Sequence, residues 1–104
     1  MMSGTDERVS AKRFRVEGAV QGVGFRWWTK KMASEGGLVG WVRNRADGSV
    51  EVKARGRPEA VERFGEALRE GPPPARVEAV YEEDLGDGNR EHAAEWTDFS
   101  IEQG

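Results

Sequence analysis

Along the chain, hydrophobic patterns typical of β-strands alternate with patterns typical of helices. The order of these patterns limits the fold more than any other feature of the sequence. Residues 12–17 alternate polar and apolar side chains, which is typical of a half-buried β-strand. After a glycine-rich connection, Phe25, Trp28 and Met32 recur at the spacing of one helix face. The sequence therefore predicts a strand, a glycine-rich loop and a helix in direct succession.

A hairpin and a second helix follow this unit. Residues 38–44 and 49–55 flank Asp47-Gly48, a dipeptide that favours tight turns between antiparallel strands. Pro58 suits the first turn of a helix, because a backbone N–H would have no partner there. The apolar positions of the later elements are Val61, Phe64 and Leu68 in this helix, Val77, Ala79 and Tyr81 in a fourth strand, and Phe99 and Ile101 in a short fifth strand.

The order β-α-β-β-α-β with a terminal strand predicts the fold class. We expect an α+β protein of the ferredoxin-like, split βαβ type. This is a two-layer sandwich in which two helices cover one face of an antiparallel sheet of four to five strands. A chain of 104 residues can bury one hydrophobic core of two layers but not a second one. We therefore predict a single domain over residues 12–104, preceded by a flexible segment at residues 1–11.

The composition excludes several kinds of chemistry. The sequence contains no cysteine, so disulfides, cysteine-ligated zinc, iron–sulfur clusters and a thiol nucleophile are ruled out. His92 is the single histidine, so the sequence gives little support for a histidine metal site or a Ser/His/Asp triad. The formal net charge of −3 argues against a generic binder of polyanions. Because no apolar run approaches the ~18 residues of a membrane span, we expect a cytoplasmic protein without a membrane partner.

One stretch carries the signs of an anion-binding site. Residues 18–26 join the first predicted strand to the first helix and contain glycines at positions 18, 22 and 24. Glycines let successive backbone N–H groups turn inward, and the N-terminus of a helix adds partial positive charge. Arg26 follows in the first turn, where its guanidinium can contact two phosphate oxygens. The glycine spacing matches neither G-x-G-x-x-G nor a P-loop, so a dinucleotide or nucleoside triphosphate is poorly supported as the ligand.

Two motifs of this sequence are similar to those of the acylphosphatase family. The first is Val-Glu-Gly-Ala-Val-Gln-Gly-Val-Gly-Phe-Arg at residues 16–26, and the second is Gly-Trp-Val-Arg-Asn at residues 40–44, followed by the Asp47-Gly48 turn. The ending Asp-Phe-Ser-Ile at residues 98–101 also resembles the last strand of the family, so the resemblance extends over residues 12–101. It implies hydrolysis of an acyl phosphate to a carboxylate and inorganic phosphate, without a metal, another cofactor or a covalent intermediate.

The resemblance also implies roles for particular residues. Arg26 is implied to bind the phosphate group of the substrate, and Asn44 to position the attacking water. The backbone amides implied to complete the phosphate-binding loop belong to Val20, Gln21, Gly22, Val23, Gly24 and Phe25. Such chemistry needs no strong nucleophile, because a carboxyl–phosphate anhydride already carries a good leaving group. Arg45, beside Asn44, and Trp27, at the start of the helix, depart from the usual family pattern and leave the substrate preference open.

Two other functions stay open on the sequence alone. An RNA-binding domain can share the ferredoxin-like scaffold, but its aromatic residues project from central strands, whereas Phe25 here begins a helix. The basic positions predicted on one sheet face are Arg13, Arg15, Lys53 and Arg55. We expect this face to be solvated and to lack an aromatic pair for stacking bases, although it could steer an anionic substrate. The second alternative is a non-catalytic domain that senses a small phosphorylated ligand. We therefore expect a monomeric hydrolase whose partners are an acyl phosphate and its phosphate product, and not nucleic acid.

Overall fold

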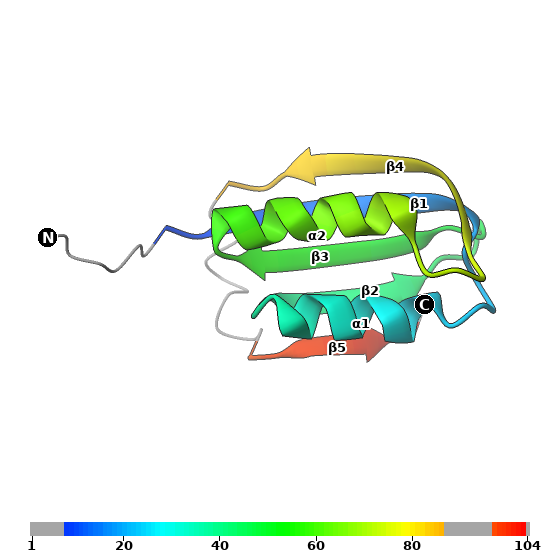
Figure 1. Cartoon of the computed structure of the whole chain (residues 1–104), viewed down its shortest axis with the longest axis horizontal. Helices are drawn as coiled ribbons and strands as arrows, with labels where there is room; N and C mark the ends of the chain where they lie inside the picture. The colour runs from blue at the N-terminus through cyan, green and yellow to red at the C-terminus, as the bar shows by residue number, and fades with distance from the viewer. Residues whose placement is uncertain (1–7, 87–96, 104) are drawn as a thin grey trace, which may run out of the picture.

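The computed structural model describes residues 8–86 and 97–103. Its elements run in the order β1 (Ser10–Ala19), α1 (Phe25–Glu35), β2 (Val39–Asn44), β3 (Val50–Gly56), α2 (Pro58–Glu70), β4 (Arg76–Asp84) and β5 (Phe99–Glu102). This is the predicted element order, with each helix inserted between two strands (Figure 1). β1 begins at Ser10, slightly ahead of the predicted domain boundary at Lys12, and residues 1–7 lie outside the described part of the chain, as does His92.

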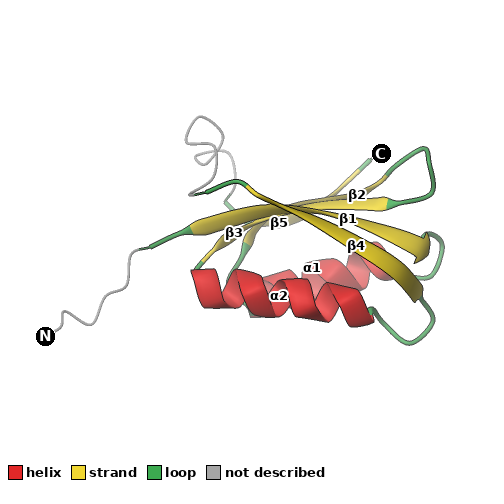
Figure 2. Ribbon diagram, turned by 90° about the horizontal axis from the view of Figure 1, so that it is seen from above, coloured by secondary structure: helices red, strands yellow, loops and turns green. Residues whose placement is uncertain are grey.

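The five strands form one sheet in the spatial order β4-β1-β3-β2-β5, and both helices cover the same face of it (Figure 2). This arrangement confirms the predicted two-layer sandwich. The first four strands pair antiparallel, as predicted, but β5 runs parallel to β2, so the sheet is mixed rather than wholly antiparallel. The direction of β5 follows from where β4 ends. The last residue of β4 lies beside Lys12 and the first residue of β5 lies beside Gly40, and both of these pair with Ala54. β5 therefore starts at the end of the sheet where β4 stops, and runs opposite to β4 on the other edge.

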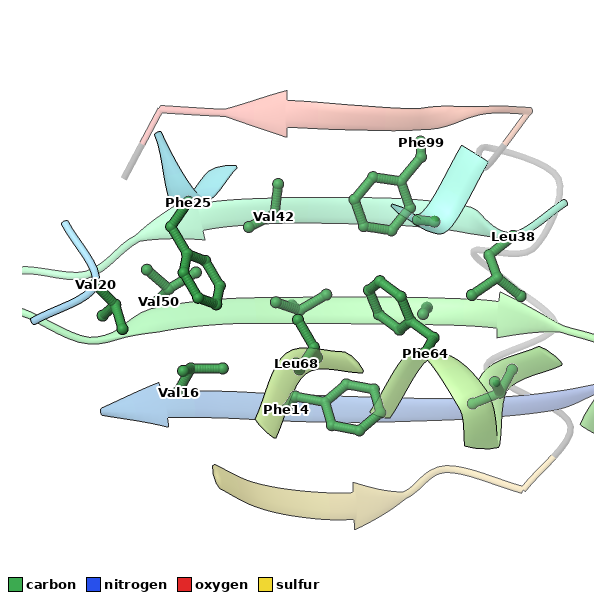
Figure 3. Packing of buried hydrophobic residues seen from close by; sticks show 14 of the residues in the cluster. Phe14, Val16, Val20, Phe25, Leu38, Val42, Val50, Phe64, Leu68 and Phe99 are labelled. Atoms are coloured by element: carbon green, nitrogen blue, oxygen red, sulfur yellow. The ribbon is translucent and has the colours of Figure 1, made fainter. Parts of the chain in front are cut away.

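The hydrophobic core lies between the sheet and the two helices (Figure 3). α2 contributes the predicted stripe, because Val61, Phe64 and Leu68 are all buried. Phe64 packs edge-on against Phe14 of β1 and Phe99 of β5, at ring-centroid distances of 5.8 and 6.0 Å. Burying one side chain of this size stabilises a fold by roughly 1.5–3 kcal/mol. This aromatic row therefore ties α2 to both halves of the sheet.

α1 faces the sheet with a stripe slightly rotated from the predicted one. Its fully buried residues are Phe25, Thr29 and Ala33, whereas Trp28 and Met32 are half-buried and pack against the core. The two stripes are close because residues three and four apart share one face of a helix with 3.6 residues per turn. No helix among the described residues is long and apolar enough to cross a membrane.

Val77, Ala79 and Tyr81 do not share one face of β4, contrary to the predicted alternation. The pairing of β4 with β1 shifts between Glu17 and Gly18, which oppose Ala79 and Val77, so Glu78 of β4 is the extra residue of a bulge. A bulge changes which strand positions face the core on its two sides. Val77 therefore packs against the core, whereas Tyr81 lies on the sheet face that no helix covers, with 53% of its surface exposed. We call this uncovered face the open face.

One end of the sandwich collects the segments that carry the two family-like motifs. β1 and β2 both end there, at Ala19 and Asn44, and α1 begins there. The strand register aligns them, because Val16 and Asn44 both pair with Val50 of β3. The loop at residues 20–24 and the turn between β2 and β3 are therefore neighbours at what we call the site end.

Candidate active site

The loop at residues 20–24 leaves its backbone N–H groups without partners in the part of the chain that the structure describes. None of the N–H groups of residues 20–25 donates a hydrogen bond to a backbone carbonyl of the described residues. α1 begins directly after the loop, with Gly24 as its N-cap, no side-chain hydrogen bond at the cap and no acidic residue in its first turn. Free N–H groups and the helix dipole make such a helix N-terminus attractive to anions. The geometry therefore fits the anion site expected from the sequence.

Two glycines shape this loop. Gly22 and Gly24 have φ angles of +77° and +78°, in the left-handed region that glycine adopts without strain. A Cβ atom built on either glycine would meet no heavy atom within 4 Å, so the space beside the loop is open. Gly18, near the end of β1, serves a different purpose, because a Cβ atom there would lie 2.1 Å from the carbonyl oxygen of Arg76. Gly18 permits two strands to approach, whereas Gly22 and Gly24 set the curvature of the loop.

Arg26 lies in the first turn of α1 and is half-buried. Its guanidinium makes no ion pair or side-chain hydrogen bond with any residue that the structure describes. A cation in the first helical turn is disfavoured by ~0.3–1 kcal/mol through the dipole, whereas a charged hydrogen bond to a bound anion contributes ~1.5–3 kcal/mol. The position therefore suits an arginine that binds an anion better than one that stabilises the helix.

Asn44 is the last residue of β2 and lies on the same sheet face as Val42, the face that the helices cover. Its Oδ1 atom is buried without a hydrogen-bond partner, and among the described residues only the Oγ1 atom of Thr29 shares this condition. Buried polar atoms are nearly always hydrogen-bonded, so an unpartnered one calls for an explanation. An amide at this position can accept a hydrogen bond from a molecule that enters the site end, as the role expected for Asn44 requires.

The side chain of Gln21 joins the loop to the turn between β2 and β3. Its Nε2 atom donates hydrogen bonds to the backbone carbonyls of Arg45 and Ser49, both at 2.8 Å. The structure thereby brings the glycine-rich loop beside the segment that follows Asn44. Sequence analysis assigned Gln21 a backbone amide only. The available signal for a side-chain role was a primary amide within a stretch that is otherwise apolar or glycine.

Arg45 directs its charge to the open face and not to the loop. Its Nη1 atom lies 2.8 Å from Oε1 of Glu51, and Nη2 of Arg43 lies 2.9 Å from the same oxygen. Burial by itself raises the pKa of Glu51, but the hydrogen bonds from Arg43 and Arg45 outweigh it and hold this pKa below its ordinary value. Trp27, the other departure from the family pattern, is 70% exposed on α1.

The open face carries aromatic as well as charged residues. Trp41 of β2 and Tyr81 of β4 both lie there, separated by β1 and β3. The guanidinium of Arg43 covers the ring of Trp41, and that of Arg15 covers the ring of Tyr81, each at 4.8 Å from the centroid. Tyr81 reaches this face because the bulge at Glu78 changes which positions of β4 point to it.

A hollow of about 410 Å³ on the open face combines basic and acidic side chains in equal number. It is lined by Arg13, Arg15, Arg45, Glu51, Tyr81, Glu82 and Glu83. The three arginines each form an ion pair with a carboxylate, so the positive charge within this hollow is largely paired. Within residues 8–86 and 97–103, no group of three His, Cys, Asp or Glu side chains is placed to hold a metal ion.

The fold and the site end define a class of small ferredoxin-like proteins that present a glycine-shaped loop, an uncapped helix N-terminus and a free arginine to an anion. The family model described as acylphosphatase matches residues 12–101. The chain belongs to the acylphosphatase family.

Individual relatives agree with this assignment. The chain is 51% identical over 80 residues to an acylphosphatase of Salinibacter ruber, which covers 77% of this chain and 81% of that protein. It is 52% identical over 85 residues to an acylphosphatase of Rhizorhabdus wittichii, with 80% and 85% of the two chains covered. The solved structure of an acylphosphatase from Coxiella burnetii matches 97% of this chain and 100% of its own, with a TM-score of 0.82 and 34% identity. The protein is therefore a hydrolase with the function of an acylphosphatase, and the roles of its individual residues stay predictions.

Proposed function

We propose that the protein hydrolyses the carboxyl–phosphate bond at the loop of residues 20–24. In this proposal the loop amides and Arg26 bind the phosphate group, and Asn44 positions the attacking water. One observation supports the proposal: at one helix N-terminus without a side-chain cap, neither the N–H groups of residues 20–25 nor the guanidinium of Arg26 has a partner among the described residues. A tetrahedral anion with several oxygens is the ligand that such a set of donors fits.

These donors serve the transition state because they already surround the phosphoryl oxygens before the reaction begins. As the bond to the leaving group breaks, negative charge redistributes over the phosphoryl oxygens and the departing carboxylate. Donors that are fixed in place stabilise this charge without a reorganisation cost, and each charged hydrogen bond contributes about 1.5–3 kcal/mol. Arg26 supplies the formal charge, and the loop amides supply the directionality.

Asn44 supplies the geometry for the nucleophile. Its amide offers an acceptor and two donors, which can orient a water molecule in line with the bond that breaks but cannot deprotonate it. The water oxygen attacks phosphorus, the bond from phosphorus to the acyl oxygen breaks with its electron pair on the carboxylate, and the proton passes to a phosphoryl oxygen. Because the carboxylate is a good leaving group, placement and charge stabilisation suffice without a metal or a covalent intermediate.

The proposal is tested by following the ultraviolet absorbance of benzoyl phosphate during hydrolysis in the presence of EDTA. We expect wild-type turnover to survive EDTA and Arg26→Ala to lose both phosphate binding and turnover. The matched control is Arg63→Ala, which removes an exposed arginine of α2 that also makes no ion pair with the described residues. Loss of wild-type activity in EDTA would contradict metal independence. Near-normal turnover by a folded Arg26→Ala variant would overturn the assignment of the phosphate ligand.

We further propose that the protein works as a monomer and does not bind nucleic acid. The pairing of arginines with carboxylates on the open face supports the second part. Light scattering after size exclusion measures the mass, and a gel shift with single-stranded RNA at moderate salt measures binding. A dimeric mass or a retarded RNA band would each contradict the corresponding part.

A further inference from the structure

The loop at residues 20–24 is held by side chains rather than by backbone hydrogen bonds of its own. Val20 and Phe25, on either side of its centre, bury their side chains in the core and are each 1% exposed. Between these two anchors, Gln21 is the one described residue whose side chain forms hydrogen bonds to another segment, through the two bonds of 2.8 Å to the turn between β2 and β3. Gln21 therefore fixes the part of the loop that the hydrophobic anchors leave free.

The turn that receives the Gln21 amide is itself fixed. The Arg45 N–H donates to the carbonyl of Ser49 at 2.8 Å, and the Gly48 N–H donates to the carbonyl of Arg45 at 3.1 Å. Both carbonyls that accept from Gln21 thus belong to the hydrogen-bonded frame of the turn. Arg45 directly follows Asn44 in the chain, so a side chain bound to this turn is also fixed relative to Asn44.

We propose that Gln21 is a positioning residue that sets the separation between the phosphate-binding loop and Asn44. This inference rests on the proposed function, in which the loop holds the phosphorus atom and Asn44 holds the water. The two groups belong to separate segments, so in-line attack depends on how those segments are held together. A misplacement of about 1 Å between reacting groups can lower turnover on the order of 10²-fold. A primary amide suits the task because its two N–H groups can serve two carbonyls at once.

The test is a double-mutant cycle between Gln21 and Asn44, measured on benzoyl phosphate. Gln21→Met keeps the length of the side chain and removes both donors, and Gln103→Met makes the same change at an exposed position. We expect Gln21→Met to lower kcat on the order of 10- to 100-fold, and Gln103→Met to leave it unchanged. In the Asn44→Ala background, where the water is no longer positioned, Gln21→Met should lower kcat by less than about threefold.

Other roles of Gln21 give different patterns. If Gln21 only stabilised the fold, Gln21→Met would lower Tm and leave the kcat of the folded enzyme unchanged. If it only supported phosphate binding, the substitution would raise KM and the inhibition constant of inorganic phosphate while sparing kcat. Either pattern, or an equal loss of kcat in both backgrounds, would overturn the inference while the proposed function stands. Wild-type kcat in the single variant Asn44→Ala is a separate result, which would overturn the proposed role of Asn44 and the positioning role together.

Discussion

Arginine side chains are paired with carboxylates on the open face, whereas Arg26 at the site end has no such partner among the described residues. On the open face, Arg43 and Arg45 share one carboxylate oxygen of Glu51, at 2.9 and 2.8 Å. At the site end, Arg26 has no ion pair with the described residues, and the first turn of α1 contains no acidic residue. A guanidinium that already holds a carboxylate must release it before it can bind a phosphate. At the site end, the fold therefore leaves Arg26 available, because no carboxylate of the described residues pairs with it.

The neutral polar groups within the site end also differ in whether they have protein partners. The turn between β2 and β3 satisfies its carbonyls through backbone hydrogen bonds and the Gln21 amide. At the site end, the N–H groups of residues 20–25 and the Oδ1 atom of Asn44 have no such partners among the described residues. Groups without protein partners contribute to ligand binding rather than to stability. Substitutions in the two regions should therefore separate activity from stability.

The substitution Asn44→Ala should have the largest effect, and it should lower activity rather than stability. We expect turnover to fall about 10²–10³-fold, which corresponds to roughly 2.7–4 kcal/mol of transition-state stabilisation. Because the Oδ1 atom of Asn44 has no protein partner, the free energy of unfolding should change by less than about 1 kcal/mol. Hydrolysis of benzoyl phosphate and chemical denaturation measure the two effects on one preparation.

Thr29→Val is the matched control for Asn44→Ala. The Oγ1 atom of Thr29 is also buried without a partner, but it lies on α1 at a fully buried position against the sheet. Replacing the hydroxyl by a methyl group of similar shape removes an unsatisfied polar atom, so stability should hold or rise and turnover should not change. Equal losses of turnover in the two variants would show that the loss in Asn44→Ala is not specific to the site end.

Two glycines sharpen the comparison, because one lies in the sheet and the other in the loop. A Cβ atom at Gly40, whose φ is +143°, would lie 2.0 Å from the carbonyl oxygen of Lys53. Gly40→Ala must therefore force β2 and β3 apart, and we expect a loss of about 3 kcal/mol in the free energy of unfolding. Gly22→Ala meets no such obstacle, so it should cost about 1 kcal/mol in backbone strain and instead weaken the binding of phosphate.

Thermal unfolding and competitive inhibition by inorganic phosphate separate the two glycine variants. A Gly40→Ala protein as stable as wild type would contradict the close approach of the two strands. A Gly22→Ala protein with wild-type phosphate inhibition would remove the loop amides from the proposed site. Either result would weaken the distinction between glycines that pack and glycines that bind.

The features that could be predicted from sequence are those with local signals. The buried stripe of α2 and the place of Arg26 at the start of α1 both follow from periodicity and from the glycines that precede the helix. The parallel direction of β5 has no local signal, because it depends on which edge of the sheet the strand joins. The exposure of Tyr81 likewise depends on the bulge at Glu78 of β4, which is defined only by how β4 pairs with β1.

The candidate site also combines features that have a local sequence signal with features that depend on distant segments. The family-like motifs predict, through the resemblance, that Arg26 and Asn44 carry the chemistry. They do not indicate partners that come from elsewhere in the chain. The carbonyls that receive the Gln21 amide, and the carboxylate that captures Arg45, are set only when β2 and β3 pair beside the loop. Motifs therefore give a prediction for the groups that meet a ligand, but none for the contacts that hold those groups in place.

The smallest effect is expected on the open face, where charge contributes to stability instead of activity. Glu51→Gln keeps the shape of the side chain but removes the charge that Arg43 and Arg45 share. We expect the free energy of unfolding to fall by about 1–2 kcal/mol at neutral pH, with kcat unchanged. Urea denaturation and benzoyl phosphate hydrolysis are the two measurements. A loss of kcat in the folded Glu51→Gln variant would show that the open face contributes to activity, which would contradict the contrast between the two regions.

The pH dependence of stability tests directly whether the charge of Glu51 stabilises the folded protein. Although burial raises the pKa of Glu51, the hydrogen bonds from Arg43 and Arg45 hold it below its ordinary value in the folded state. The ionised carboxylate therefore stabilises the fold above the unfolded-state pKa, and this contribution is lost as the pH falls through the folded-state pKa. Wild-type stability should decrease more steeply than that of Glu51→Gln on acidification, so the two curves should converge at low pH. Curves that stay parallel across this range would show that the charge of Glu51 does not stabilise the folded protein, and that the arginines of the open face are as available to an anion as Arg26.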